Sequence, residues 1–231
     1  MNITIIAGAR PNFMKIAPII EAIKEKKALG FDINYRLVHT GQHYDKYLSD
    51  TFFTELHIPF PDANLEVKSG TQAEQTGAIM IGFEKELQQN PCDLVMVVGD
   101  VTSTMACTIV AKKAGIDVAH VEAGIRSGDM NMPEEINRIV TDSLTDYFFT
   151  TSSYANKNLA ALGVCESKVF FVGNVMIDTL LKHIPRFEKP QIWESLNLEE
   201  KKYMVMTLHR PSNVDEEHQL KNLIHKIVSL G

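Results

Sequence analysis

The sequence predicts an α/β fold built on a doubly wound parallel sheet, and three observations support this. Strand-like apolar runs alternate with amphipathic helical segments along most of the 231 residues. Many of these runs are continuously apolar, which is typical of strands covered by helices on both faces. The segments between each run and the next helix are short and often contain glycine, as in parallel β–α units.

Hydrophobic spacing and turn residues give the expected order of the elements. Strands are predicted at residues 3–7, 35–40, 93–98, 117–121, 147–151 and 168–172. Helices are predicted at about residues 13–27, 44–56, 71–89, 102–114, 134–144, 152–162 and 175–183. Pro18 is tolerable only near the start of its helix, whereas Pro133 suits a first helical position.

The domain organisation is expected to change near residue 184. Residues 1–183 are predicted to form one Rossmann-like domain. Residues 184–231 are predicted to hold a linker, which includes the PRFEKP segment, and the first part of a second, truncated Rossmann-like domain. The basis is that one strand at 203–208, with its flanking helices, cannot cover a parallel sheet of its own.

Composition narrows the class of protein. A hydrophobic fraction of 45% and a formal net charge of −6 fit a globular protein and argue against a nucleic-acid binder. No apolar run approaches the ~20 residues of a membrane span, and residues 1–7 lack the basic start of a signal peptide. The three cysteines are widely spaced, which fits a reducing compartment, so a cytoplasmic location is expected.

Acidic residues follow two neighbouring strands and open a later helix. Asp100 follows the strand at 93–98, Glu122 follows the strand at 117–121, and Glu134 and Glu135 begin a helix. Because the carboxyl ends of parallel strands share one edge of a sheet, these acids are expected to converge on one crevice. Asp100 also fits an ordinary helix cap, and the two glutamates fit the helix dipole. Glu122 has no capping role, which favours acid–base chemistry.

Cationic residues also occur at predicted strand ends. Arg10 and Lys15 lie in the first strand-to-helix turn, where they could grip a diphosphate beside a helix N-terminus or simply be solvated. His209 and Arg210 follow the strand at 203–208 and fit either charge stabilisation in a crevice or an ordinary hydrogen-bonded turn. Arg138 is a possible partner of the acids or of ligand oxygens.

Two kinds of site are not indicated by the motifs. The first turn does not read G-x-G-x-x-G, so the sequence does not indicate a nicotinamide or flavin cofactor. His120 and Glu122 share one face of a strand, but no third metal ligand is placed by spacing. We therefore expect no cofactor and no metal, and we expect His120 to be a structural histidine with satisfied hydrogen bonds.

Taken together, the motifs resemble the non-hydrolysing UDP-N-acetylglucosamine 2-epimerases. The resemblance covers the whole chain, in the family's order, through GARPNFMK, HTGQHYD, VVGDVTST, HVEAGIRSGD, PEEINR, GNVMIDTLL and TLHRPSN. It implies a glycosyltransferase-B-like two-domain fold, with this chain as its N-terminal portion. It also implies UDP-GlcNAc and UDP as ligands, a homodimer when full length, and a role in cell-surface polysaccharide biosynthesis.

The resemblance further implies a reaction and residue roles. The reaction converts UDP-GlcNAc to UDP-ManNAc by eliminating UDP to a 2-acetamidoglucal and adding it back. Catalytic positions match Asp100, Glu122, Glu134 and His209, and the shortened loop at 128–133 leaves Glu135 as an alternative to Glu134. Substrate-binding positions match Arg10, Lys15, Arg138 and Arg210, and a regulatory UDP-GlcNAc site matches Gln42 and His43.

Alternatives remain at the level of function. A hydrolysing 2-epimerase would release ManNAc and UDP, although PEEINR argues against that branch. A glycosyltransferase of the same fold would transfer the sugar to an acceptor. A non-catalytic sugar-nucleotide-binding module would bind without exchanging the C2 proton. Most of the family's uridine-binding residues have no counterpart in this chain, so little or no turnover is expected from these 231 residues alone.

Overall fold

The computed structural model describes residues 1–41, 58–208 and 214–229. The chain divides into two compact units, Met1–Pro185 and Arg186–Gly231, which are described separately. The helix expected at 44–56 lies outside the described residues.

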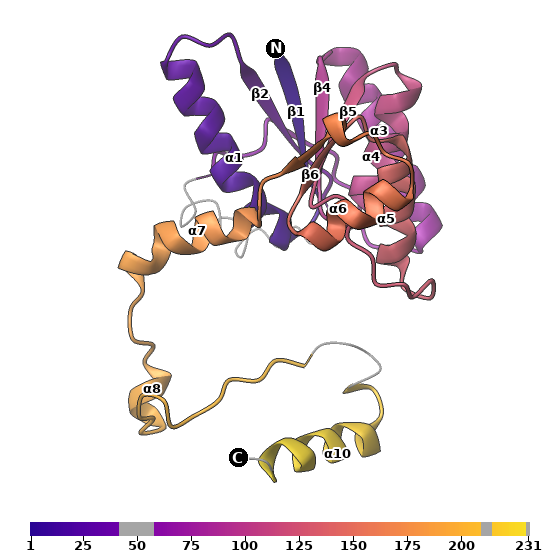
Figure 1. The fold of residues 1–231 in the computed structure, drawn as a ribbon. Coiled ribbons are helices and arrows are strands. Elements are labelled where there is room, and N and C mark those ends of the chain that lie inside the picture. Colours follow the sequence, from indigo (N-terminus) through magenta and orange to yellow (C-terminus); the bar gives the residue numbers. More distant parts are fainter. Residues whose placement is uncertain (42–57, 209–213, 230–231) are drawn as a thin grey trace. The chain divides into compact units, whose positions relative to one another are not determined.

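The first unit contains a parallel sheet, as predicted (Figure 1). Its described part has seven strands in the order β3-β2-β1-β4-β5-β6-β7. In the described residues, each pair of neighbouring strands in this sheet is parallel. The strands are β1 (Asn2–Ala7), β2 (Asn34–His39), β3 (Ala63–Asn64), β4 (Leu94–Val98), β5 (Asp117–Val121), β6 (Tyr147–Thr150) and β7 (Val169–Phe171). Only β3 has no counterpart among the predicted strands.

Helices cover both faces of this sheet. They are α1 (Arg10–Ala28), α3 (Gln72–Gln89), α4 (Thr102–Lys113), α5 (Pro133–Leu144), α6 (Ser153–Ala161) and α7 (Val175–His183), with short 3-10 turns at Glu166–Lys168 and Ile184–Arg186. Helix α7 packs on α1, whereas α4 packs between α3 and α5 on the other face. The doubly wound α/β fold is therefore confirmed.

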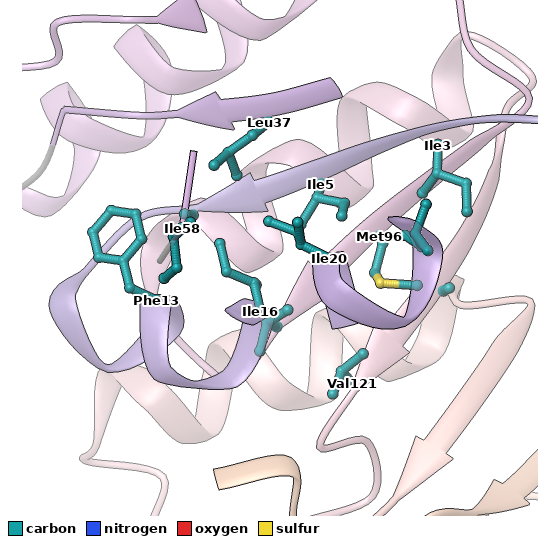
Figure 2. Close-up of a cluster of buried hydrophobic side chains, with 13 residues drawn as sticks. Ile3, Ile5, Phe13, Ile16, Ile20, Leu37, Ile58, Met96 and Val121 are labelled. Carbon is teal, nitrogen blue, oxygen red and sulfur yellow. The ribbon is translucent and has the colours of Figure 1, made fainter. Parts of the chain in front are cut away.

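Alternating side chains of the strands form two cores, one under each helical layer. On the α1 side, Ile5, Leu37 and Met96 pack against Ile16 and Ile20 of α1 (Figure 2). On the opposite face, side chains of β4 pack against α3 and α4, and this second core includes Val95, Val97, Ile79, Phe83 and Val110. Burial on both faces explains why the strands are continuously apolar in sequence.

Helix α1 corrects the expectation for Pro18. The helix begins at Arg10, so Pro18 lies in its interior and not near its start. A proline there removes the N–H that would bond to the carbonyl of Met14. Thr179 of α7 replaces that donor, because its Oγ1 donates to Met14 O at 2.6 Å. The missing hydrogen bond within α1 is thus supplied by the helix that packs on it.

The strand order reverses direction between β1 and β4, which are neighbours in the sheet. At such a reversal, the loops at the carboxyl ends of the two strands leave in opposite directions and open a crevice. Here the crevice is bordered by the turn from β1 into α1 and by the turn at Gly99 and Asp100 after β4. The candidate site is therefore expected at this edge.

The second unit has little regular structure in its described part. It contains α8 (Ile192–Ser195) and α10 (Glu217–Val228). The helix that precedes residues 203–208 ends at Ser195, and the strand expected at 203–208 does not form. That segment stays apolar and uncovered, since Met204 and Val205 are 74% and 83% exposed. That residues 184–231 begin a second Rossmann-like domain stays a prediction.

Among the helices that the structure describes, none has the length and apolar character needed to cross a membrane.

Candidate active site

Glu122 lies at the carboxyl end of β5 in an uncommon backbone conformation. Its φ of 72° is in the left-handed region, which favours glycine. The N–H groups of Glu122 and Ala123 both donate to Phe149 O, at 3.0 and 3.1 Å, and this holds the turn. Backbone strain at a non-glycine residue persists only where its surroundings impose it, and such residues cluster at functional sites.

Lys15 reaches the Glu122 carboxylate from α1. Its Nζ donates to Glu122 Oε2, and the two side chains are only 11% and 13% exposed. The pair packs over Gly99, where an added Cβ would lie 3.2 Å from Lys15 Nζ and 3.5 Å from Glu122 Oε2. Gly99 also has a φ of 73°, so both its conformation and its neighbours favour glycine. The Lys15–Glu122 ion pair thus packs directly against the turn after β4.

Asp100 does not act as a helix cap. The N-cap of α4 is Val101, and no side chain bonds at that cap. The Asp100 carboxylate instead accepts from Arg138 Nη2 of α5, and Asn137 Nδ2 donates to Asp100 O at 2.9 Å. The capping explanation is therefore wrong, and Asp100 faces a cation supplied by another helix.

The Glu135 carboxylate holds the loop at Ser127 and Gly128 in place. Its carboxylate accepts from the backbone N–H groups of Ser127 and Gly128 at 2.9 and 3.1 Å, and from Ser127 Oγ and Arg138 Nη1, both at 3.0 Å. Burial alone would raise its pKa, but these four hydrogen bonds lower the pKa of Glu135 to about 2. A carboxylate held ionised by this many donors is poorly suited to exchange a proton near neutral pH.

Glu134 has a different environment. It is half-buried in the first turn of α5, next to Glu135. Among the residues that the structure describes, no hydrogen-bond or salt-bridge partner of its carboxylate is found. Of the two adjacent glutamates, Glu134 is therefore the one that remains available to a ligand.

The turn from β1 into α1 is closed by Asn12. Its Oδ1 accepts from the N–H groups of Gly8 and Ala9 at 3.0 and 2.9 Å, and its Nδ2 donates to Val98 O at 3.0 Å. Pro11 has no N–H, so few backbone donors of this turn remain for a phosphate group. The cations at this helix start are Arg10, its first residue, and Lys15. An anion bound here would depend mainly on side chains.

A second buried network lies behind the acids. His120 Nδ1 lies 2.7 Å from Asp142 Oδ1, and His120 Nε2 lies 2.8 Å from Gly99 O. Asp142 Oδ2 accepts from Gly124 N at 3.0 Å and pairs with Arg126 Nη1 at 2.7 Å. Burial would raise the pKa of Asp142, but His120 and Arg126 outweigh this effect and lower it. The expectation of a satisfied structural His120 is confirmed.

The structure brings most of the predicted site residues to one edge of the sheet. Lys15, Asp100, Glu122, Glu134 and Arg138 lie on the turns and helices that follow β1, β4 and β5, and Arg10 begins α1. His209, Arg210, Gln42 and His43 lie outside the described residues. Within the described ranges, no group of three histidine, cysteine or acidic side chains could hold a metal ion.

Two supporting residues, Asn12 and Asp142, are not among the candidates predicted from the sequence. One signal was available, because an asparagine in the first turn of a helix often bonds to nearby backbone groups. The signal for Asp142 was weaker. It is a charged residue on the buried side of α5, which also carries Glu135 and Thr141.

Comparison with known proteins agrees with this geometry. A family model described as UDP-N-acetylglucosamine 2-epimerase matches residues 24–231. The chain belongs to the UDP-N-acetylglucosamine 2-epimerase family. The resemblance stated from the motifs is thus confirmed at the level of this family.

Individual members of the epimerase family extend over the whole chain. The UDP-N-acetylglucosamine 2-epimerase of Methanocaldococcus jannaschii is 41% identical over a 234-residue alignment, which covers 100% of this chain and 62% of that protein. A Pseudomonas aeruginosa relative, UDP-2,3-diacetamido-2,3-dideoxy-D-glucuronate 2-epimerase, is 37% identical. The match covers 98% of this chain and 62% of the length of that relative. This chain thus spans 62% of the length of these curated relatives.

A solved structure of the epimerase family has the same fold. The crystal structure of the M. jannaschii UDP-GlcNAc 2-epimerase in complex with UDP-GlcNAc and UDP superposes with a TM-score of 0.86 at 42% identity. The match covers 99% of this chain and 62% of that one. The fold class predicted from the sequence is confirmed by this neighbour as well.

Proposed function

We propose that this chain carries the acid–base residues of a non-hydrolysing UDP-GlcNAc 2-epimerase. The observation that supports the proposal is that Asp100 and Glu122, which follow the neighbouring strands β4 and β5, are each paired with a cation, while Glu134 lies in the first turn of the helix that supplies Arg138. Three carboxylates from different elements are more than capping or packing requires. The relatives that act on UDP-N-acetylglucosamine support the choice of substrate.

The reaction requires two proton transfers at C2 and the departure and return of UDP at C1. A carboxylate removes the proton from C2 of the sugar, and the C2–H electron pair forms a C1=C2 double bond as the C1–O bond to UDP breaks. A second acid then delivers a proton to the opposite face of C2, and a diphosphate oxygen attacks C1 again. Because the two proton transfers occur on opposite faces, at least two acid–base groups are needed. Asp100, Glu122 and Glu134 are assigned to these transfers.

The cations are assigned to the diphosphate and to the acids. Lys15 and Arg138 contact Glu122 and Asp100, so they orient these carboxylates while placing positive charge at the crevice. Charge developing on the departing UDP is stabilised by such preorganised cations. Arg10, His209 and Arg210 are assigned to the same role, and Gln42 and His43 to a regulatory UDP-GlcNAc site, on the resemblance alone.

Incubation in D2O tests this proposal. The full-length gene product is mixed with UDP-GlcNAc, and the sugar is followed by NMR. Deuterium at C2 of both UDP-GlcNAc and UDP-ManNAc is expected. Free ManNAc would instead identify the hydrolysing reaction, and unchanged C2 hydrogen would leave a transferase or a binding module. UDP-2,3-diacetamido-2,3-dideoxy-D-glucuronate serves as the competing substrate, since a relative at 37% identity bears its name.

The proposal has two further parts. The 231-residue chain alone should show little or no turnover, which the same NMR assay checks. The full-length protein should be a homodimer, which light scattering checks by its mass in solution.

A further inference from the structure

The turn that carries Asp100 is fixed to β5 at both polar atoms of Gly99. The β4–β5 ladder ends at Val98 and Val121. Beyond it, Gly99 N donates to Val121 O at 3.0 Å, and His120 Nε2 lies 2.8 Å from Gly99 O. The second of these bonds depends on one side chain, because no further strand pairing reaches Gly99.

Asp142 connects that histidine to two other parts of the site. Its Oδ1 faces His120 Nδ1, and its Oδ2 binds Gly124 N and Arg126 Nη1. The side chains of His120 and Asp142 are 1% and 0% exposed, so neither can reach a substrate in the crevice. Their influence on the chemistry must pass through the residues that they hold.

Hydrogen-bond donors and acceptors fix where the protons lie. Gly99 O can only accept, so His120 Nε2 is the donor in that bond. Asp142 Oδ2 accepts a hydrogen bond from Gly124 N and forms an ion pair with Arg126, and both interactions stabilise the ionised carboxylate. His120 Nδ1 lies 2.7 Å from Asp142 Oδ1, so both ring nitrogens have a buried polar partner. A buried network satisfied in this way gives a single, rigid geometry.

We propose that His120 and Asp142 are positioning residues that fix the spacing of the three carboxylates. Asp100 follows Gly99, Glu122 lies between His120 and Gly124, and Glu134 lies on the same helix as Asp142. The His120–Asp142 pair is thus connected to the three segments that carry these carboxylates, because it bonds to Gly99 and Gly124 and Asp142 belongs to α5. The inference rests on the proposed function in assigning a purpose to this spacing, but the network itself exists independently of it.

Two amide variants of His120 separate its contact with Gly99 O from its contact with Asp142. In His120→Gln, the side-chain N–H can take the place of Nε2 and still donate to Gly99 O. In His120→Asn, the shorter side chain can take the place of Nδ1 and still donate to Asp142, but it cannot reach Gly99 O. Both variants replace the ring with a neutral amide in the same buried position. They are therefore a matched pair that differs mainly in which hydrogen bond survives.

The first measurement is amide hydrogen exchange of residues 99–102 in the 231-residue chain. We expect exchange at least ~10-fold faster in His120→Asn than in His120→Gln, while the amides of β1 stay equally protected in both. Equal exchange of residues 99–102 in the two variants would overturn the proposal. If either variant fails to fold, ¹⁵N NMR of the wild-type His120 ring decides: Nε2 should carry a proton, and an unprotonated Nε2 would overturn the proposal.

The second measurement is C2 exchange kinetics of the full-length protein. His120→Asn should lower kcat by about 100-fold with KM within about 3-fold, and His120→Gln should retain most of kcat, because small misplacement of reacting groups is costly. Equal losses of kcat would show a merely structural role and reject the positioning role. Absence of C2 exchange in the wild type would refute the proposed function instead, and the amide-exchange comparison would still decide whether the network fixes the turn.

Discussion

Lys15 and Glu122 are 107 positions apart in the sequence and form a largely buried ion pair at the carboxyl edge of the sheet. Burying two charges costs free energy that their attraction often fails to recover, and apolar residues of similar size would frequently serve stability as well. The pair also requires a glycine at position 99 and a left-handed conformation at Glu122. These local costs are expected at a catalytic site rather than in a structural core.

The close approach of α4 to the first turn predicts a specific intolerance at Gly8. A Cβ there would lie 2.3 Å from Ser103 Oγ and 2.7 Å from Ser103 Cβ. Gly8→Ala should therefore lower the free energy of unfolding by about 1–3 kcal/mol. The control is Gly77→Ala, since a Cβ at this helical glycine meets no atom within 4 Å.

The control should raise stability by about 0.5–1 kcal/mol, because alanine favours a helix more than glycine does. Urea unfolding of both variants checks the pair of predictions. Stabilisation by Gly8→Ala would contradict the contact with Ser103.

Pro18 and Thr179 should be energetically coupled. Thr179→Val removes the donor to Met14 O, which Pro18 leaves without a helical partner, so stability should fall by about 1–3 kcal/mol. In a Pro18→Ala background, the N–H of residue 18 can bond to Met14 O, and the same change should cost less. A double-mutant cycle from thermal unfolding measures the coupling. Equal costs in the two backgrounds would disprove it.

Glu135 should make stability depend on pH in the acid range. Its pKa is lowered to about 2 in the folded protein, whereas an unfolded glutamate has a pKa of about 4.3. Stability from Glu135 is thus fully present above about pH 4.3 and is lost as the pH falls towards about 2. Glu135→Gln should cost about 3–5 kcal/mol at neutral pH, because Arg138 loses a buried partner. It should also flatten the stability profile between about pH 4.3 and 2, measured by urea unfolding at each pH.

Glu134 should behave in the opposite way. Its carboxylate has no partner among the described residues, so Glu134→Gln should change stability by less than about 0.5 kcal/mol. Loss of an acid–base group should lower kcat of the full-length protein by about 100-fold to 10,000-fold. Epimerisation assays of both glutamine variants check this contrast. Normal turnover by Glu134→Gln would remove it from the mechanism.

The sequence predicts the strands and turns that form this site better than it predicts the side-chain contacts within it. Apolar runs and glycine turns locate the strands, and parallel topology brings Asp100 and Glu122 to one edge. Adjacent glutamates are harder to separate, because both start the same helix and both suit its dipole. Successive helical residues point about 100° apart, so only the packing of α5 shows that Glu135 turns inward while Glu134 does not.

Long-range partners account for the other differences. Nothing local in the sequence pairs Lys15 with Glu122, or Asn12 with Val98, because these contacts depend on how strands and helices pack. The segment 203–208 has the composition of a strand, but a strand also needs a neighbour for its backbone hydrogen bonds. The described part of the second unit supplies none, and the segment has no regular secondary structure.

The most direct test of the account is the rate of deuterium incorporation at C2 of UDP-GlcNAc by the Glu122→Gln variant of the full-length protein. Its control is Glu86→Gln, which breaks another ion pair, the partly buried one to Arg36 at 2.6 Å, away from the site. Glu122→Gln should incorporate deuterium about 100-fold to 10,000-fold more slowly than the wild type, while Glu86→Gln should keep the wild-type rate. Incorporation at the wild-type rate by Glu122→Gln would contradict the assignment of this carboxylate to the C2 proton.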